Sequence, residues 1–217
     1  MRVQLKNIFP KLTNKQITIY NPIDFENIEK LSEAKEELPL KERKLLDSKY
    51  ICSVGRLDEG QKDFTTLIKV YSNLVKKGII EEKLVIVGDG PHKNSLETLV
   101  KDLNVEKEVI FLGKKSNPYI WIKNSKLFIL SSKYEGFPTV LIEALVLNVP
   151  TVSSNCLTGP KEILETGKYG KLFEVGNEIE LERMTIDVLN NPNYIKTREY
   201  IKEKFGKGFE NLEKIMR

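Results

Sequence analysis

The stretch EGFPTVLIE places two glutamates, Glu135 and Glu143, on either side of an expected helix start. Glu135 follows an apolar segment typical of a strand, and Pro138 stands where a helix tolerates a missing N–H. The first N–H groups of a helix have no partner within it. Those of Thr139 and Val140 are therefore available to an anion, with the helix dipole behind them. This arrangement predicts a phosphate site between two carboxylates.

Helical side chains lean toward the N-terminus of their helix, so the Glu143 carboxylate can face the same cleft as Glu135. A nucleotide-sugar would match such a site, because its diphosphate lies between the hydroxyls of a sugar and those of a ribose. The alternative interpretation is a strand-to-helix turn with two surface glutamates, and the spacing alone favours neither.

The stretch VGRLDEGQKDF supplies two cations, Arg56 and Lys62. Arg56 follows Gly55 at the end of an apolar run, and Lys62 precedes the next expected helix, so both can project over one edge of a sheet. There they would clamp a diphosphate and, without a metal, stabilise the charge that it gains when it departs in a glycosyl transfer. The alternative is two ordinary exposed cations in a chain with 35 Lys and Arg residues.

Apolar runs and helical stripes alternate along the chain after Tyr50. The expected strands are YICSVG, KLVIVG, VIFLG, KLFILSS, PTVSS and KLFEV. The expected helices are 64–77, 96–103, 120–125, 140–147, the KEILE stretch, 178–189 and 195–205. Fully apolar strands that alternate with helices predict an α/β fold with a doubly wound, Rossmann-like parallel sheet. Ligands bind such sheets at the carboxyl ends of the strands, where the residues described above are expected.

The chain is expected to have three parts. Residues 1–49 form a connecting segment with a short strand near Tyr20 and one or two short helices interrupted at Pro39. Residues 50–192 form the Rossmann-like domain that would bind a nucleotide-sugar. Residues 193–217 form a C-terminal helical segment with an apolar stripe. That stripe either packs against protein, which is the favoured interpretation, or lies on a membrane surface.

The composition excludes several chemistries. His92 is the single histidine of the sequence, and we expect an exposed loop residue rather than an acid or base. The two cysteines, Cys52 and Cys156, cannot form a disulfide framework or a Cys₄ zinc site, and they favour a cytoplasmic protein. No membrane span or signal peptide is expected. The net charge of +4 gives little support to a nucleic-acid partner.

The stretch GDGP, from Gly88 to Pro91, is a weak candidate for a phosphate loop. It lacks the third glycine of the GxGxxG fingerprint, so a dehydrogenase is the least favoured interpretation. We expect a tight turn near the ligand edge instead.

Taken in order, the motifs resemble those of the C-terminal, donor-binding half of GT-B glycosyltransferases, specifically of glycosyltransferase family four. The resemblance extends from about residue 19 to about Val175. It rests on YNPID, SVGRL with QKDF, LVIVGDGP, VIFLG, EGFPTVLIEAL and VPTVSSNCLTGPKEIL. It implies a retaining enzyme of the hexosyltransferase type that uses a nucleotide-diphosphate sugar, with UDP as the expected nucleotide and no metal or other cofactor.

The resemblance also implies roles for individual residues. Arg56 and Lys62 would bind the donor diphosphate, Glu135 would contact the transferred sugar, and Glu143 would hold the ribose hydroxyls. Glu135, Arg56 and Lys62 are therefore the expected catalytic residues. The other donor-binding residues that it implies are Gly55, Leu112, Gly113, Gly136, Phe137, Pro138, Thr139 and Val140. The Leu112–Gly113 end of VIFLG would line the base pocket.

The sequence departs from the family pattern in two ways. Gln61-Lys62-Asp63 stands where the family usually has a Lys-Gly or Lys-Asn pair. More importantly, the acceptor domain, about half of a family enzyme, has no counterpart here. Catalysis requires the acceptor to be held about 3 Å from the anomeric carbon, and no residue in this sequence is an evident candidate to hold it.

Three hypotheses follow from the sequence. The leading one is a glycosyltransferase that serves cell-surface polysaccharide or lipopolysaccharide assembly, transferring to a glycan or lipid-linked acceptor at the inner face of the membrane. The second is an inactive or split nucleotide-sugar-binding fragment that lacks the acceptor domain; in the split case a separate chain supplies that domain. The third is a sugar-nucleotide epimerase of the GT-B type, which the two spaced glutamates disfavour.

Overall fold

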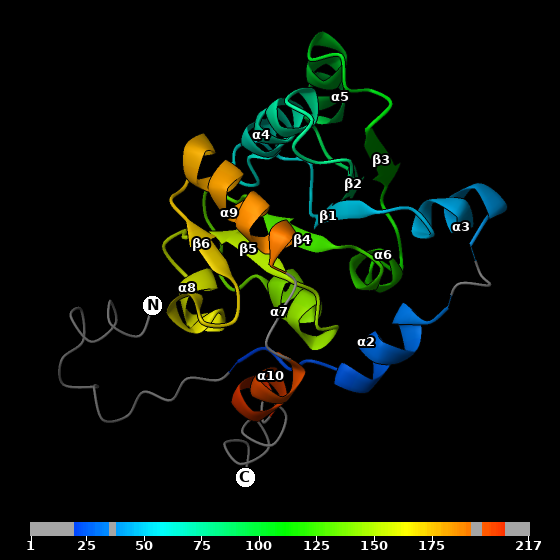
Figure 1. Cartoon of the computed structure of the whole chain (residues 1–217). Helices are drawn as coiled ribbons and strands as arrows, with labels where there is room; N and C mark the ends of the chain where they lie inside the picture. Colours follow the sequence, from blue (N-terminus) through cyan, green and yellow to red (C-terminus); the bar gives the residue numbers. More distant parts are fainter. Residues whose placement is uncertain (1–19, 35–37, 192–196, 207–217) are drawn as a thin grey trace.

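A sheet of six parallel strands forms the centre of the protein, with the strand order β3-β2-β1-β4-β5-β6 (Figure 1). The computed structural model describes residues 20–34, 38–191 and 197–206. The strands within these ranges are β1 (Tyr50–Val54), β2 (Lys83–Val87), β3 (Val109–Gly113), β4 (Leu127–Leu130), β5 (Thr151–Ser154) and β6 (Lys171–Phe173). The predicted doubly wound parallel sheet is confirmed.

Helices cover both faces of the sheet (Figure 1). The helices on one face are α4 (Phe64–Lys76), α5 (Lys93–Asp102) and α9 (Glu178–Asn190). Those on the other face are α2 (Phe25–Ser32), α6 (Tyr119–Lys123), α7 (Thr139–Val146) and α10 (Arg198–Phe205). The remaining elements are α3 (Leu40–Leu46), α8 (Pro160–Ile163) and the 3₁₀ turn η3 (Glu165–Gly167). These positions agree with the sequence prediction to within a few residues at each end.

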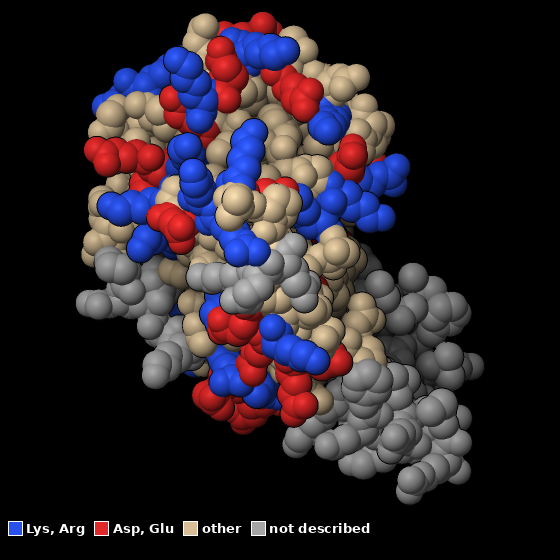
Figure 2. Space-filling view, turned by 90° about the vertical axis from the view of Figure 1, so that its right-hand side faces the viewer, with Lys and Arg blue, Asp and Glu red and all other residues tan. Residues whose placement is uncertain are grey.

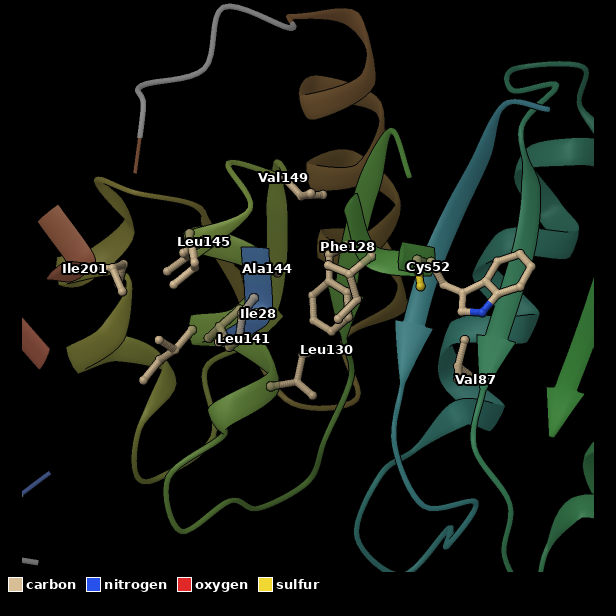
Figure 3. Close-up of a cluster of buried hydrophobic side chains, with 14 of the residues drawn as sticks. Ile28, Cys52, Val87, Phe128, Leu130, Leu141, Ala144, Leu145, Val149 and Ile201 are labelled. Carbon is tan, nitrogen blue, oxygen red and sulfur yellow. The ribbon is translucent and has the colours of Figure 1, made fainter. Parts of the chain in front are cut away.

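Two apolar layers, one on each face, hold the helices to the sheet. Neighbouring residues of β1 belong to different layers, because successive side chains of a strand point to opposite faces: Ile51 to the layer with α4, Cys52 to the layer with α7. Figure 3 shows the second layer, in which Phe128 and Leu130 of β4 face Leu141 of α7. Burial on both faces explains why strands such as β2 and β4 are apolar along most of their length.

The strand order reverses between β1 and β4. From β1 the chain builds outward through β2 to β3, then returns to place β4 on the other side of β1. The loop after β1 leads to α4 on one face, whereas the loop after β4 leads to α7 on the other (Figure 1). The two loops therefore diverge, and ligands bind open α/β sheets at such a switch point.

The segments before β1 and after α9 also pack onto the sheet. Short helices lie on either side of Pro39, as predicted, while the expected strand near Tyr20 falls largely outside the described residues. Ile201 and Phe205 of α10 are buried in the same layer as α7. The described part of the C-terminal segment therefore packs against protein; residues 193–196 and 207–217 lie outside the described ranges.

Within the described residues, no helix combines the length and the apolar character needed to cross a membrane. The face shown in Figure 2 mixes Lys and Arg side chains with Asp and Glu. It lacks the uniformly basic surface that nucleic-acid-binding proteins present.

Candidate functional site

The Glu135 carboxylate and the Lys62 ammonium meet at the switch point between β1 and β4. Lys62 Nζ lies 2.5 Å from Glu135 Oε1, and the Ser132 hydroxyl donates a hydrogen bond to the same oxygen at 2.6 Å. The Glu135 side chain is 7% exposed and that of Lys62 is 14% exposed, so little water screens the pair. Two of the three predicted catalytic residues are thus in direct contact, although they are 73 positions apart in the chain.

The end of β4 holds the loop that carries Lys62. The Ser131 hydroxyl donates to the Lys62 carbonyl oxygen at 2.9 Å, and the Lys133 N–H donates to the Gln61 carbonyl oxygen at 2.7 Å. The stem of Lys62 passes over Gly55, where an added Cβ would lie 3.5 Å from Lys62 Cδ. These contacts fix the loop backbone and the lysine stem, and they thereby direct the ammonium toward Glu135.

The helices that follow the two loops differ at their N-termini. The Glu59 carboxylate accepts hydrogen bonds from the N–H groups of Phe64 and Thr65 at 2.8 and 3.1 Å, so the start of α4 is already capped. α7 begins at Thr139 after Pro138, and no side chain caps it. An anion at this edge would therefore find free N–H groups at α7, as the sequence predicts.

The loop that carries Glu135 is braced by the loop after β5. The Thr158 hydroxyl donates a hydrogen bond to the Glu135 carbonyl oxygen. Gly159 has a φ of +94° and packs against Pro138, where an added Cβ would lie 2.4 Å from Pro138 Cδ. An added Cβ on Gly136, in contrast, would have no neighbour within 4 Å. The loop is thus supported on one side and open at Gly136, which suits a site that admits a ligand.

Glu143 is a half-buried carboxyl in the second turn of α7. Burial raises its pKa from 4.5 to about 7. Burial, together with the negative charges of Glu143 and Asp24, also raises the pKa of Tyr119. Since Tyr119 begins α6, the Glu143 carboxyl lies close to the start of that helix, and it can hold a proton near neutral pH.

We expect Glu143→Gln to raise the thermal unfolding midpoint at pH 8 and to change it little at pH 4.5. The folded state binds the Glu143 proton more tightly than the unfolded state does. The free energy of unfolding therefore falls as the pH rises from 4.5 through 7, because the buried carboxyl must lose that proton. A shift of this size corresponds to about 3 kcal/mol above pH 7, and glutamine removes the penalty. Thermal melts at both pH values measure the difference, with the exposed Glu106→Gln as control. A gain of equal size at both pH values would contradict the pKa assignment.

Leu112 and Gly113 end β3, two strands away from β1 on the same carboxyl edge. Leu112 lines a cavity of about 450 Å³ together with α3 residues such as Leu45. The Gly113 carbonyl oxygen accepts the Gly88 N–H at 2.9 Å. The predicted base-pocket residues therefore lie at the same carboxyl edge as Lys62 and Glu135. They belong to β3, however, whereas Lys62 and Glu135 follow β1 and β4.

The GDGP stretch joins the loops after β1 and β2 through the backbone. The Leu57 N–H donates to the Asp89 carbonyl oxygen, and the His92 N–H donates to the Leu57 carbonyl oxygen, both at 3.0 Å. An added Cβ on Gly88 would lie 1.8 Å from the Gly55 carbonyl oxygen. The His92 side chain is 43% exposed, and its Nδ1 accepts a backbone N–H at 3.3 Å.

Arg56 follows β1, and its side chain is exposed at the carboxyl edge of the sheet. Phe137 and Val140 are half-buried, and both pack against the layer that contains α7. No group of three or more His, Cys, Asp or Glu side chains that could hold a metal ion is present among the described residues.

Three residues of the site were not predicted from the sequence: Ser132, Glu59 and Thr158. Ser132 had a signal, because it is polar and follows the apolar run of KLFILSS at the carboxyl end of a buried strand. Glu59 caps α4 from a position outside the usual capping-box spacing. Thr158 acts through a contact between two loops, for which the sequence carries no local signal.

The fold defines an α/β protein of the Rossmann-like class, whose candidate site lies at the carboxyl edge of the sheet. The chain belongs to the family described as "Glycosyl transferases group 1", whose sequence model matches residues 34–207.

Known relatives support this assignment. A Campylobacter jejuni N-acetylgalactosamine-N,N'-diacetylbacillosaminyl-diphospho-undecaprenol 4-alpha-N-acetylgalactosaminyltransferase is 39% identical over 81% of this chain and 44% of its own length. The lipopolysaccharide 1,6-galactosyltransferase of Salmonella typhimurium is 34% identical over 57% of this chain and 34% of its own length. The chain thus spans less than half the length of these relatives.

A solved structure gives the same result for the fold. A variant of TarM from S. aureus, in complex with fondaparinux, alpha-GlcNAc-glycerol and UDP, superposes with a TM-score of 0.78 and 25% identity. The match covers 99% of this chain and 41% of that protein.

Proposed function

We propose that this chain is the C-terminal, donor-binding half of a retaining, metal-independent glycosyltransferase of the GT-B type, in glycosyltransferase family four. Its donor is a nucleotide-diphosphate sugar with UDP as the nucleotide. Its products enter cell-surface polysaccharide or lipopolysaccharide. The relatives named for lipopolysaccharide and for a diphospho-undecaprenol acceptor support this, as does the UDP bound to TarM.

One observation carries the proposal: Lys62 and Glu135 form a nearly buried pair beside the uncapped start of α7. A donor diphosphate accepts hydrogen bonds from Lys62, from Arg56 and from the first N–H groups of α7. Glu135, released from Lys62, then accepts hydrogen bonds from the hydroxyls of the transferred sugar. Glu143 does the same for the ribose.

These groups account for the chemistry of the donor side. The acceptor oxygen bonds to the anomeric carbon and its proton passes to an oxygen of the departing diphosphate, while the bond from that carbon to the phosphate oxygen breaks. The electron pair leaves with the diphosphate, whose added charge is stabilised by Lys62 and Arg56. The acceptor itself is a glycan or a lipid-linked glycan, held by a separate domain or chain at the cytoplasmic face of the membrane.

We expect the purified chain to bind UDP in the presence of EDTA, and Arg56→Ala to weaken that binding by about tenfold. A charge-assisted hydrogen bond contributes about 1.5 kcal/mol or more, which is about tenfold in a dissociation constant. Isothermal titration calorimetry measures both values, and the exposed Lys101→Ala on α5 serves as the control. Binding that requires Mg²⁺, or no binding of UDP at all, would contradict the proposal.

A further inference from the structure

Three aromatic rings meet behind the loop that carries Glu135. Phe137 belongs to this loop, whereas Tyr20 precedes α2 and Phe205 is the last residue of α10. The rings of Tyr20 and Phe137 stack with centroids 5.6 Å apart and planes at 26°. Phe205 meets Tyr20 at 4.8 Å and Phe137 at 5.7 Å, both edge to face. These three residues are called the aromatic cluster below.

Hydrogen bonds at the start of α10 fix the position of this helix and thereby that of Phe205 at its other end. The Thr197 hydroxyl donates to the Leu145 carbonyl oxygen at 2.6 Å. The Asn148 side-chain oxygen accepts the N–H groups of Thr197 and Arg198 at 3.0 and 3.1 Å. Arg198 also pairs with Glu29 of α2. These contacts tie α10 to the end of α7 and to α2, and Phe205 at the other end of the helix is 1% exposed.

Tyr20 has a second support besides its contact with α10. Its hydroxyl donates a hydrogen bond to the Glu162 carboxylate on α8. Lys204 Nζ donates to the Glu162 carbonyl oxygen at 2.7 Å, so α8 and α10 are joined at the same place. Two rings from opposite ends of the described chain therefore pack against each other and against the Phe137 ring.

The loop depends on this support because of where Phe137 lies. It stands two residues after Glu135 and two before Thr139, the first residue of α7. Gly136 has no neighbour that a Cβ would meet, so the loop has little packing of its own on that side. A shift of Phe137 would move both the carboxylate and the free N–H groups, and a misplacement of about 1 Å can cost about a hundredfold in rate.

We propose that Tyr20 and Phe205 are positioning residues of the donor site. They hold Phe137, and through it they place the Glu135 carboxylate and the uncapped start of α7 for the nucleotide diphosphate. This inference rests on the proposed function, because it concerns the geometry of the same site. It assigns a role in donor binding to two residues that do not touch the donor.

The test compares Tyr20→Leu with Tyr20→Phe in the purified full chain. Tyr20→Leu removes the ring and is expected to weaken UDP binding 5- to 20-fold, whereas Tyr20→Phe keeps the ring and should restore affinity to within about twofold of wild type. Phe205→Leu should behave like Tyr20→Leu. Ile201→Val, in the same helix but outside the aromatic cluster, controls for loss of stability and should leave affinity unchanged.

Amide hydrogen exchange of residues 135–140 gives a second measurement that does not use a ligand. Tyr20→Leu should speed exchange there, while Ile201→Val should not. If the wild-type chain binds UDP and Tyr20→Leu binds it equally well, the positioning role is wrong although the proposed function stands. If the wild-type chain does not bind UDP, the proposed function fails and this inference fails with it.

Discussion

Lys62→Met should weaken UDP binding by about 10- to 100-fold. Methionine keeps the apolar stem over Gly55 but removes the charge that the proposed diphosphate contact requires. A hydrogen bond to a charged group is worth about 1.5–3 kcal/mol, which corresponds to this range in the dissociation constant. Calorimetric titration with UDP measures the loss. Lys77→Met is the matched control, because the exposed Lys77 follows the far end of α4 and pairs with Glu182 of α9.

Glu135→Gln should have the opposite effect on UDP. In the free protein, Glu135 and the diphosphate compete for Lys62, since Lys62 Nζ lies 2.5 Å from the Glu135 carboxylate. Glutamine removes the competing charge and should raise the affinity for UDP severalfold. The same change should reduce the preference for a UDP-sugar over UDP, because the acceptor of the sugar hydroxyls is weakened. If Lys62→Met and Glu135→Gln weaken UDP binding equally, the proposed exchange of partners does not occur.

Gly88→Ala should destabilise the protein by about 3 kcal/mol or more. An added Cβ would lie 1.8 Å from the Gly55 carbonyl oxygen, and the φ of +150° is one that other residues rarely adopt. The clash is with backbone, so no side-chain rotation relieves it. Backbone strain and overpacking each cost about 1–3 kcal/mol. Equilibrium unfolding in urea measures the change.

Gly78→Ala is the matched control for that experiment. Gly78 also has a positive φ, +65°, but an added Cβ there would meet nothing within 4 Å. Gly78→Ala should lower the free energy of unfolding by only about 1–2 kcal/mol, which is the cost of a positive φ in a residue other than glycine. Equal losses for the two substitutions would mean that the contact between the loops after β1 and β2 does not constrain Gly88.

The sheet was predictable because its signal is local. Buried parallel strands must be apolar on both faces, and stretches such as KLVIVG and KLFILSS show this without reference to any other segment. The helix stripes are equally local, so α4 and α9 were placed to within a residue or two. The same local pattern predicted the free start of α7, since Pro138 marks it.

The support of the site was not predictable in this way. The strand-end pattern marks Ser132 as a polar residue at the sheet edge, but not its bond to the carboxylate oxygen that Lys62 contacts. Thr158 braces the same loop from a segment 23 positions away in the chain. The cap of α4 was equally unpredictable. Glu59 reaches the start of α4 because the loop before the helix turns back on itself, and the spacing of residues in the sequence does not indicate that turn. Side-chain contacts between loops depend on loop shape, which a single sequence encodes only indirectly.

By itself, the sequence determined the element types, their order, and the chemical groups at the strand ends. Apolar periodicity indicates which side of each segment is buried, and glycine and proline positions indicate where the segments end. Together these signals are sufficient to predict a doubly wound sheet. Only the tertiary structure decided that β1 and β4 are neighbours, which brings Lys62 to Glu135 across 73 positions, and that Tyr20 and Phe205 meet behind Phe137. The physical reason is that partners distant in the chain are chosen by how the strands and helices pack, and packing is a property of the whole fold rather than of any one segment.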